Sequence, residues 1–203
     1  LDINLKGKPA KELLSVKEPG FYSLVPDDFT GITPKVVVKE QEYVMAGGPL
    51  FIDKNHPELK FVSPVSGVVT SIERGARRKV LNIVVEAAQE QDYEEFGKMN
   101  PAAMSGEQVK EALLNTGMFA FFRQRPYDVI ADPTVQPKAI FVSAFDSAPQ
   151  APDFEFVLKG EENNFQTGLN ALSKIARTYL NINVHQTSPA LTQAKTVTIT
   201  IFD

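Results

Sequence analysis

The sequence predicts an α+β protein in which a small β domain is followed by an α/β domain. Between residues 31 and 88, short β-rich runs alternate with turns that contain Gly or Pro, a pattern typical of a small barrel or sandwich. From residue 105 onward the apolar period changes to 3.6, and strand-like and helix-like segments then alternate. We therefore expect an N-terminal extension (1–30), a β domain (31–88), a linker (89–104) and an α/β domain (105–203).

Composition narrows the classes of protein to which the chain can belong. Its 203 residues, 43% of them hydrophobic, are enough for two small domains. A net charge of −4, with both signs mixed along the chain, argues against a nucleic-acid-binding protein. No apolar run approaches the ~20 residues that span a bilayer, and the first residues do not resemble a signal peptide. We expect a chain without a membrane span that can still associate with a membrane partner.

The residue types needed for common catalytic sites are scarce. The chain has no cysteine, which excludes disulfides, cysteine-ligated iron–sulfur clusters and thiolate nucleophiles. Its two histidines, His56 and His185, are far apart and are expected to lie at surface or strand-end positions, so a zinc site or a Ser-His-Asp triad is poorly supported. Neither a GxGxxG nor a Walker-type loop is present. We expect no independent catalytic activity and no metal site.

The N-terminal half is expected to be mostly strands. Pro9–Val16 has a weak pattern for a short helix, and a Pro-Gly turn follows it. The predicted strands are all short, apolar and rich in β-branched residues: Lys35–Lys39, Leu50–Ile52, Phe61–Val62, Gly67–Ile72 and Lys79–Val85.

Two of these stretches resemble the barrel-sandwich fold of biotinyl and lipoyl domains. Val44–Leu50 is similar to the Val-X-X-Gly-X-X-Leu element of that fold, and Ser63–Val69 is similar to its Pro-x-x-Gly-x-Val turn. Pro64 can end a strand because it needs no acceptor, and Gly67 would permit the tight turn that follows. The resemblance also implies an alternative function, a carrier module modified at Lys54. Asn55–Pro57 lengthen and stiffen the loop after Lys54, which instead favours an ordinary surface lysine.

A helix is predicted after the linker, whose acidic run Asp92–Glu95 is expected to be a solvated surface. Ser105 and Gln108 have capping-box spacing, and Gly117 is expected to end the helix in the left-handed conformation. The helix leads into a stretch rich in aromatic and arginine residues: Phe119, Phe121, Phe122, Arg123, Arg125 and Tyr127. Such a stretch can be a buried structural corner, an interface with another subunit or a pocket for a flat ligand.

The remainder predicts a Rossmann-like α/β domain. Lys138–Ala144 is a near-continuous apolar run, typical of a strand covered on both faces, and Asp146 follows at its carboxyl end, where open α/β sheets favour ligand contacts. A helix is predicted over Glu161–Leu180, with apolar residues at 165, 169, 172, 176 and 179, and a strand over Asn183–His185. The chain starts at Leu1 and ends directly after the alternating run Thr196–Phe202, so we expect the α/β domain to be truncated at its C-terminus.

Taken together, the motifs resemble those of one family, the A subunits of sodium-translocating NADH:quinone reductases of bacterial inner membranes. The resemblance covers the whole chain and depends on the order and spacing of seven segments: Lys35–Glu40, Phe51–Lys54, Phe61–Val69, Gln108–Gly117, Arg123–Tyr127, Ala139–Asp146 and Glu162–Ser173. The order is also similar to that in the NADH-binding flavoprotein subunit of complex I and in the Rnf complex C subunit.

The resemblance implies a peripheral subunit on the cytoplasmic face of the membrane, with flavins and iron–sulfur centres in partner subunits and a link to ubiquinone. In the flavoprotein of complex I, a Gly-rich loop follows the corresponding helix and binds the FMN phosphate. Here that place is occupied by Met118–Phe122, which lacks glycine, so we expect the chain to bind neither FMN nor NADH. A contact with quinone or with a partner subunit would use the aromatic and arginine residues above, from Phe119 to Tyr127, together with Asp146.

Overall fold

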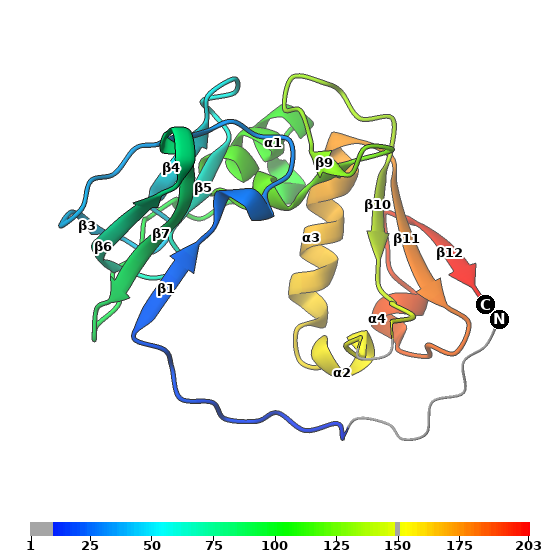
Figure 1. The fold of residues 1–203 in the computed structure, drawn as a ribbon. Coiled ribbons are helices and arrows are strands. Elements are labelled where there is room, and N and C mark those ends of the chain that lie inside the picture. Colours follow the sequence, from blue (N-terminus) through cyan, green and yellow to red (C-terminus); the bar gives the residue numbers. More distant parts are fainter. Residues whose placement is uncertain (1–9, 149–150) are drawn as a thin grey trace. The chain divides into compact units, whose positions relative to one another are not determined.

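The computed structural model describes residues 10–148 and 151–203, which divide into two compact units (Figure 1). The barrel unit comprises residues 17–99 and 110–136, and the α/β unit comprises the other described residues: 10–16, 100–109, 137–148 and 151–203. Among the described residues, no helix combines the length and the apolar character needed to cross a bilayer.

The barrel unit consists of two main antiparallel sheets and a small hairpin. The larger sheet has the strand order β1-β7-β6-β3, the second has the order β2-β4-β5, and β8 pairs with β9. The strands are β1 (Phe21–Leu24), β2 (Pro34–Val36), β3 (Tyr43–Val44), β4 (Pro49–Asp53), β5 (Lys60–Val62), β6 (Gly67–Arg74), β7 (Val80–Ala87), β8 (Arg123–Gln124) and β9 (Val129–Ile130). All five predicted β-rich runs are therefore strands, within a few residues of the expected ends, and the predicted barrel-sandwich class is confirmed.

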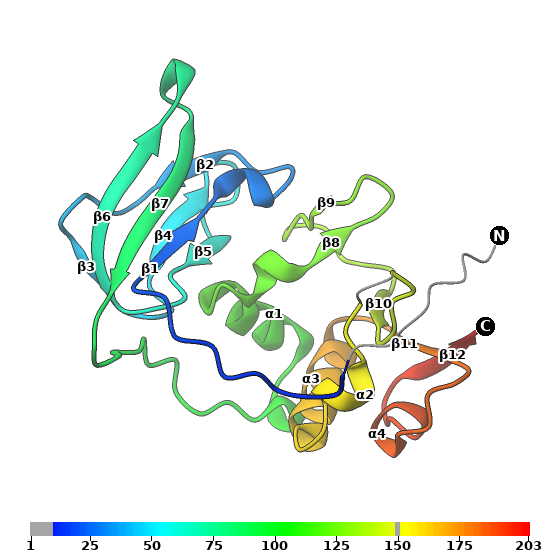
Figure 2. The ribbon, with the colours of Figure 1, turned by 60° about the horizontal axis from the view of Figure 1, so that its bottom comes forward.

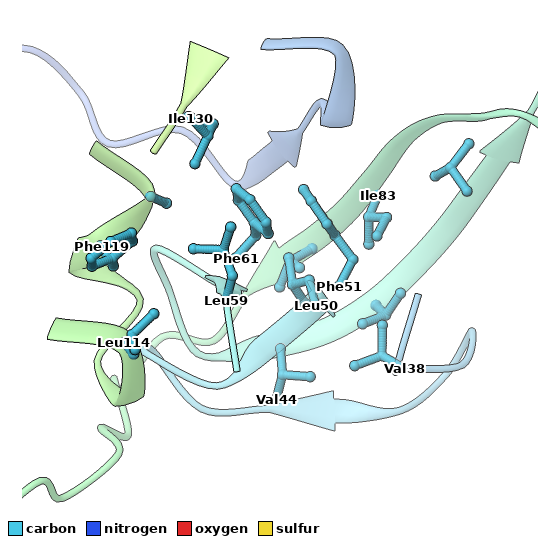
Figure 3. Packing of buried hydrophobic residues seen from close by; sticks show 14 residues of the cluster. Val38, Val44, Leu50, Phe51, Leu59, Phe61, Ile83, Leu114, Phe119 and Ile130 are labelled. Atoms are coloured by element: carbon cyan, nitrogen blue, oxygen red, sulfur yellow. The ribbon is translucent and has the colours of Figure 1, made fainter. Parts of the chain in front are cut away.

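A single apolar core lies between the two sheets (Figure 3). Phe51 and Phe61 come from adjacent strands and stack with ring centroids 4.5 Å apart, while Phe29 packs edge-on against Phe61 at 4.6 Å. Leu50 and Ile83 are fully buried beside them. Offset and edge-on aromatic pairs add roughly 0.5–1.5 kcal/mol each to the free energy of burial, so the three rings stabilise the β4–β5 side of the core. Ile83 of β7 belongs to the same buried cluster and comes from the other sheet.

The segment expected to be an N-terminal extension contributes a strand. β1 pairs with β7 along its whole length, from Phe21 opposite Glu86 to Leu24 opposite Ile83. Its four residues alternate between exposed and half-buried positions. The sequence pattern for this strand is weak because an edge strand buries little of either face. Residues 10–16 form no helix, which differs from the short helix expected there; Pro9, its first residue, and the rest of residues 1–9 lie outside the described residues.

The start of the expected linker is bound to the barrel by the buried Ser66. Ser66 Oγ accepts a hydrogen bond from the N–H of Asp92, and the Gln91 side chain accepts one from the N–H of Ser66. Ser63 closes the same turn by donating its hydroxyl to the carbonyl of Val65 at 2.6 Å. The Ser63–Val69 motif therefore also anchors the chain that leaves the barrel.

The α/β unit has a three-stranded parallel sheet in the order β10-β11-β12. Its strands are β10 (Ile140–Ser143), β11 (Thr178–Asn183) and β12 (Thr198–Phe202), and its helices are α2 (Phe154–Val157), α3 (Glu162–Ile175) and α4 (Pro189–Thr192). Leu169 of α3 and Leu191 of α4 pack with Leu180 and Ile182 of β11 in one buried cluster. The predicted α/β class is confirmed.

Two details of this unit differ from the sequence expectations. The helix ends at Ile175, and β11 then runs from Thr178 to Asn183, so Tyr179 lies on a strand. The strand predicted at Asn183–His185 is wrong except for Asn183, because the chain turns at residues 184 and 185. Residues 178–183 alternate between buried and half-buried positions, and this strand period outweighs the helical spacing of Ala176 and Tyr179. β10 was expected to be covered on both faces, but Phe141 is 67% exposed and stacks only on Tyr179 among the described aromatic rings.

Candidate functional site

The predicted helix that leads to the aromatic stretch begins with the expected capping box. α1 runs from Gly106 to Asn115, and its start is closed by two reciprocal hydrogen bonds, Ser105 N–H to Gln108 Oε1 at 2.8 Å and Gln108 N–H to Ser105 Oγ at 3.2 Å. Gly117 follows the helix with φ of 75°, as predicted. A Cβ there would also lie 2.7 Å from Val62 Cγ1, so the chain passes close to β5 at this point.

The phenylalanines that follow point in opposite directions. Residues Met118–Phe121 form the short 3₁₀ helix η4, whose Phe119 is 8% exposed and stacks on Phe122 with ring centroids 5.4 Å apart. Figure 3 shows Phe119 directed into the core beside Leu114. Phe121, by contrast, is 74% exposed. Phe119 and Phe122 therefore form a structural corner of the barrel unit, and only Phe121 presents its ring to solvent.

The two arginines lie on and next to the β8–β9 hairpin and share one carboxylate. Arg123 donates to the carbonyl of Asp128 at 3.1 Å, and its guanidinium is 3.9 Å from the Asp128 carboxylate. The guanidinium of Arg125 approaches the other oxygen of that carboxylate at 3.7 Å. Tyr127 lies in the turn between β8 and β9, next to Asp128, and is 77% exposed. We call residues 118–128 the arginine-aromatic loop; its exposed rings and guanidiniums lie on one short segment.

Asp146, the remaining predicted site residue, belongs to the α/β unit. It follows β10 on the surface, and its carboxylate accepts a hydrogen bond from the N–H of Ala148 at 2.8 Å. This contact is a local turn cap, because the oxygen satisfies a main-chain donor two residues further on.

His56 has partners that the sequence did not indicate. Its ring nitrogens lie 3.8 Å from Glu58 and 3.8 Å from Asp132, which is far away in the sequence. Asp132 also accepts hydrogen bonds from the hydroxyl and the N–H of Thr134, at 2.6 and 2.8 Å, and the hydroxyl bond is the main cause that lowers the pKa of this carboxyl. The Asp-Pro-Thr sequence at 132–134 is a local turn signal, and it could have predicted the contact between Asp132 and Thr134. Within the described ranges, no group of three or more His, Cys, Asp or Glu side chains could hold a metal ion.

Two main-chain amides of the arginine-aromatic loop already have acceptors. The N–H of Ala120 donates to Gly117 and that of Phe122 donates to Phe119. Those two amides are therefore not available to bind a phosphate. The segment can offer rings and guanidinium donors to a partner.

Two domain models of one family match the chain in order. The NqrA N-terminal barrel-sandwich hybrid domain matches residues 1–88, and the NqrA second alpha/beta domain matches residues 104–203.

Several bacterial proteins are similar over most of the chain. The A subunit of the Na(+)-translocating NADH-quinone reductase from Pseudomonas aeruginosa strain UCBPP-PA14 is 31% identical over 182 residues, which cover 89% of this chain and 41% of that protein. The proteins of the same name from Photorhabdus laumondii and Yersinia pseudotuberculosis are 33% and 29% identical, over 86% and 98% of this chain and 40% and 45% of their own lengths. The chain thus spans less than half the length of these curated relatives. The two domain models, in this order, together with the observed barrel and α/β units, show that the chain belongs to the NqrA family.

Proposed function

We propose that the chain supplies the barrel-sandwich and second domains of the A subunit in a sodium-translocating NADH:ubiquinone reductase. The observation that carries this proposal is the match of both NqrA domains in order, together with the name shared by the relatives above. In this role the chain is a peripheral subunit on the cytoplasmic face of a bacterial inner membrane. It meets the membrane through its partner subunits and takes part in an enzyme without catalysing a step itself.

The first consequence of the proposal is that flavin chemistry takes place in other subunits. The backbone of Met118–Phe121 is folded into η4, and the buried ring of Phe119 stacks on that of Phe122. A flavin phosphate placed there would meet aromatic carbon instead of converging N–H donors, so its charge would not be compensated. This geometry supports a chain that binds neither FMN nor NADH.

The absorbance spectrum of the purified chain tests this part. After incubation with FMN and removal of free flavin, we expect no flavin absorbance and no quenching of flavin fluorescence. A stoichiometric yellow complex would contradict the non-flavin assignment while leaving the family membership intact.

The second consequence concerns assembly, for which the arginine-aromatic loop is the strongest candidate. Phe121 and Tyr127 are more than 70% exposed and make no ring contact with another described aromatic side chain. Arginine and aromatic residues are enriched at the centres of protein interfaces, where each buried anchor can contribute more than about 1 kcal/mol. We infer that the loop docks on a partner subunit.

Co-purification with the membrane subunits tests the docking. Changing Phe121 and Tyr127 together to Ala is expected to weaken retention at least tenfold, which corresponds to about 1.4 kcal/mol. Tyr93→Ala is the matched control, because Tyr93 is also an exposed aromatic side chain of the barrel unit. If the unmodified chain fails to associate with any membrane subunit, the reductase role is wrong. If the double variant associates as well as the unmodified chain does, the docking surface lies elsewhere.

Quinone contact at the same loop is a second candidate role. The guanidiniums of Arg123 and Arg125 are held by Asp128 close to the exposed tyrosine in sequence, and a quinone offers two carbonyl acceptors and a flat ring. A photoreactive quinone analogue is expected to label residues within 118–128 in the assembled complex. Labelling confined to other subunits would reject this role and leave the docking proposal untouched.

The geometry does not favour the alternative of a carrier module modified at Lys54. Lys54 directly follows β4, and its N–H donates to the carbonyl of Thr33 at 2.8 Å. The chain then passes through residues 55–59 before β5, so Lys54 is not at the tip of a tight hairpin. The intact mass of chain expressed in a host with lipoyl and biotinyl ligases checks this directly, and we expect the unmodified mass.

A further inference from the structure

The barrel unit has a pocket of about 560 Å³ at the far end of the β6–β7 hairpin. Eight residues from the ends of four strands and the hairpin turn line it: Pro34, Lys35, Val36, Lys54, Arg74, Arg78, Lys79 and Val80. β2 and β4 belong to one sheet, and β6 and β7 belong to the other, so the pocket lies where the ends of the two sheets meet. Figure 2 shows the hairpin and its turn, formed by the short helix η2 (Ala76–Arg78).

The lining of this pocket is strongly cationic in a chain whose net charge is −4. It contains five Lys or Arg residues and no carboxylate. Lys79 alone among the five forms an ion pair within the described residues, with Asp27 at 2.5 Å. The remaining cations, Lys35, Lys54, Arg74 and Arg78, have no such partner in the described part of the chain. Like charges that line one pocket repel one another, and a bound anion would reduce that repulsion.

Arg78 lies in the hairpin turn, whose backbone has an unusual conformation. Arg77 and Arg78 both have left-handed φ angles, of 55° and 61°, in a turn closed by a 2.8 Å hydrogen bond from Gly75 N–H to the Lys79 carbonyl. Residues other than glycine rarely adopt this conformation. The Arg74 guanidinium also donates to the carbonyl of Arg78, which ties the end of β6 to the turn. The side chains of Arg74 and Arg78 are thus held at the same pocket wall.

We propose that this pocket binds a phosphate-bearing ligand with at least two negative charges. Planar guanidiniums pair with phosphate oxygens through two hydrogen bonds, and lysines add point charges, so the mixed set of Arg and Lys suits a diphosphate or a phosphate ester. The lining contains no aromatic residue on which a nucleobase or an isoalloxazine could stack. A phospholipid headgroup and a soluble diphosphate share the required chemistry. This assignment also gives Lys54 a role as an electrostatic contact.

Calorimetric titration of the full chain with inorganic diphosphate at low salt tests the site. We expect saturable binding with a dissociation constant of about 1 mM or tighter, which weakens as salt is added. Arg78→Gly removes a lining guanidinium at a position that favours glycine and should weaken binding about tenfold, the effect of one lost charge-assisted contact. Arg77→Gly is the matched control, because it removes the same charge and relieves the same kind of backbone strain at the neighbouring residue. Arg77 does not line the pocket, so the affinity for diphosphate should change less than about twofold.

Lys54→Gln provides a second variant on a different element, and it is expected to weaken diphosphate binding by a similar factor.

Vesicles of phosphatidylcholine with added phosphatidylglycerol distinguish the two sources of phosphate. If the chain sediments with these vesicles, and Arg78→Gly loses this binding while Arg77→Gly keeps it, the ligand is a lipid headgroup. If the chain binds diphosphate but does not sediment with the vesicles, the ligand is soluble.

The proposal is overturned if neither probe binds, or if the two arginine variants lose binding equally. Failure of the docking tests above would not bear on this site, because Phe121 and Tyr127 do not line it.

Discussion

Gly67 shows why a single residue can fix the pairing of two strands. It begins β6 opposite Ala87, and a Cβ added there would lie 1.9 Å from the carbonyl oxygen of Glu86. The sequence pattern suggested a glycine needed for a tight turn, whereas the structure shows that the glycine is needed because a neighbouring main chain passes so close. Backbone atoms cannot move aside as a flexible side chain can.

Gly67→Ala should therefore destabilise the barrel unit by about 3 kcal/mol, at the upper end of the range for overpacked positions. Gly20→Ala is the control, since nothing lies within 4 Å of a Cβ built at Gly20. It should change the free energy of unfolding by less than about 0.5 kcal/mol. Denaturant unfolding of both variants measures the difference, and equal stabilities would show that β6 and β7 can separate at this point without cost.

Asp132 makes a pH-dependent contribution to the stability of the barrel unit. Its pKa in the folded chain is lowered from 3.8, first by the hydroxyl of Thr134 and then by the N–H of that residue, with a smaller contribution from the charge of His56. A carboxyl whose folded pKa is depressed stabilises the fold above the unfolded value. That contribution is lost as the pH falls through the folded pKa.

Thr134→Val should reduce stability at neutral pH, and the loss should shrink as the pH is lowered below 3.8 towards the folded pKa of Asp132. Asp132 is partly exposed, so solvent screening keeps the effect small. Urea unfolding at a series of pH values measures it. A difference that stays constant through the acid range would mean that Thr134 acts through packing alone.

At the scale of elements, α3 and β11 show how a strand and a helix compete for the same residues. The apolar spacing of 165, 169, 172, 176 and 179 fits a helix throughout, yet the helix stops at Ile175. From Thr178 the chain can place Thr178, Leu180 and Ile182 on the buried face of the sheet while pairing with β10. Pairing on both sides with β10 and β12 outweighs the local helical pattern, because a central strand satisfies its main-chain groups and buries its side chains together.

Leu169 is the residue through which α3 covers the sheet, and it is only 2% exposed. Leu169→Ala should destabilise the α/β unit by about 3 kcal/mol, the usual cost of lost burial plus a cavity. Leu13→Ala makes the same change at a highly exposed position of the same unit and should have an effect below about 0.5 kcal/mol. Thermal unfolding followed by circular dichroism compares them, and similar stabilities would indicate that α3 is not packed on β11.

At the scale of the whole molecule, each compact unit has its own core. Phe51 and Phe61 belong to one cluster of buried residues, and Leu169 and Leu180 belong to another. Units with separate cores can lose their structure in separate steps.

We expect calorimetry of the chain to show two unfolding transitions. Phe51→Ala, which removes a fully buried ring, should lower the midpoint of one transition, and Leu169→Ala should lower that of the other. The expected cost of Phe51→Ala is about 3–5 kcal/mol. A single transition that both variants shift equally would show that the two units unfold as one.

The sequence determined the local features of this protein. The capping box at Ser105, the left-handed Gly117, the five β-rich runs and the order of a β unit before an α/β unit all follow from patterns of neighbouring residues. Such features are set within a few residues of chain, where hydrogen bonds and backbone preferences act without help from distant segments.

Only the tertiary structure decided which side chains of the arginine-aromatic loop are free to meet a partner and which cations share a pocket. Phe119 and Phe121 are the same residue type two positions apart, but one fills the core against Phe122 and the other faces solvent. Lys35 and Lys54 are brought together by the pairing of β2 with β4, and Arg78 joins them from the β6–β7 hairpin of the other sheet. The physical reason is that burial and charge proximity depend on strand register and on how the two sheets meet, which are properties of the folded chain that no local pattern contains.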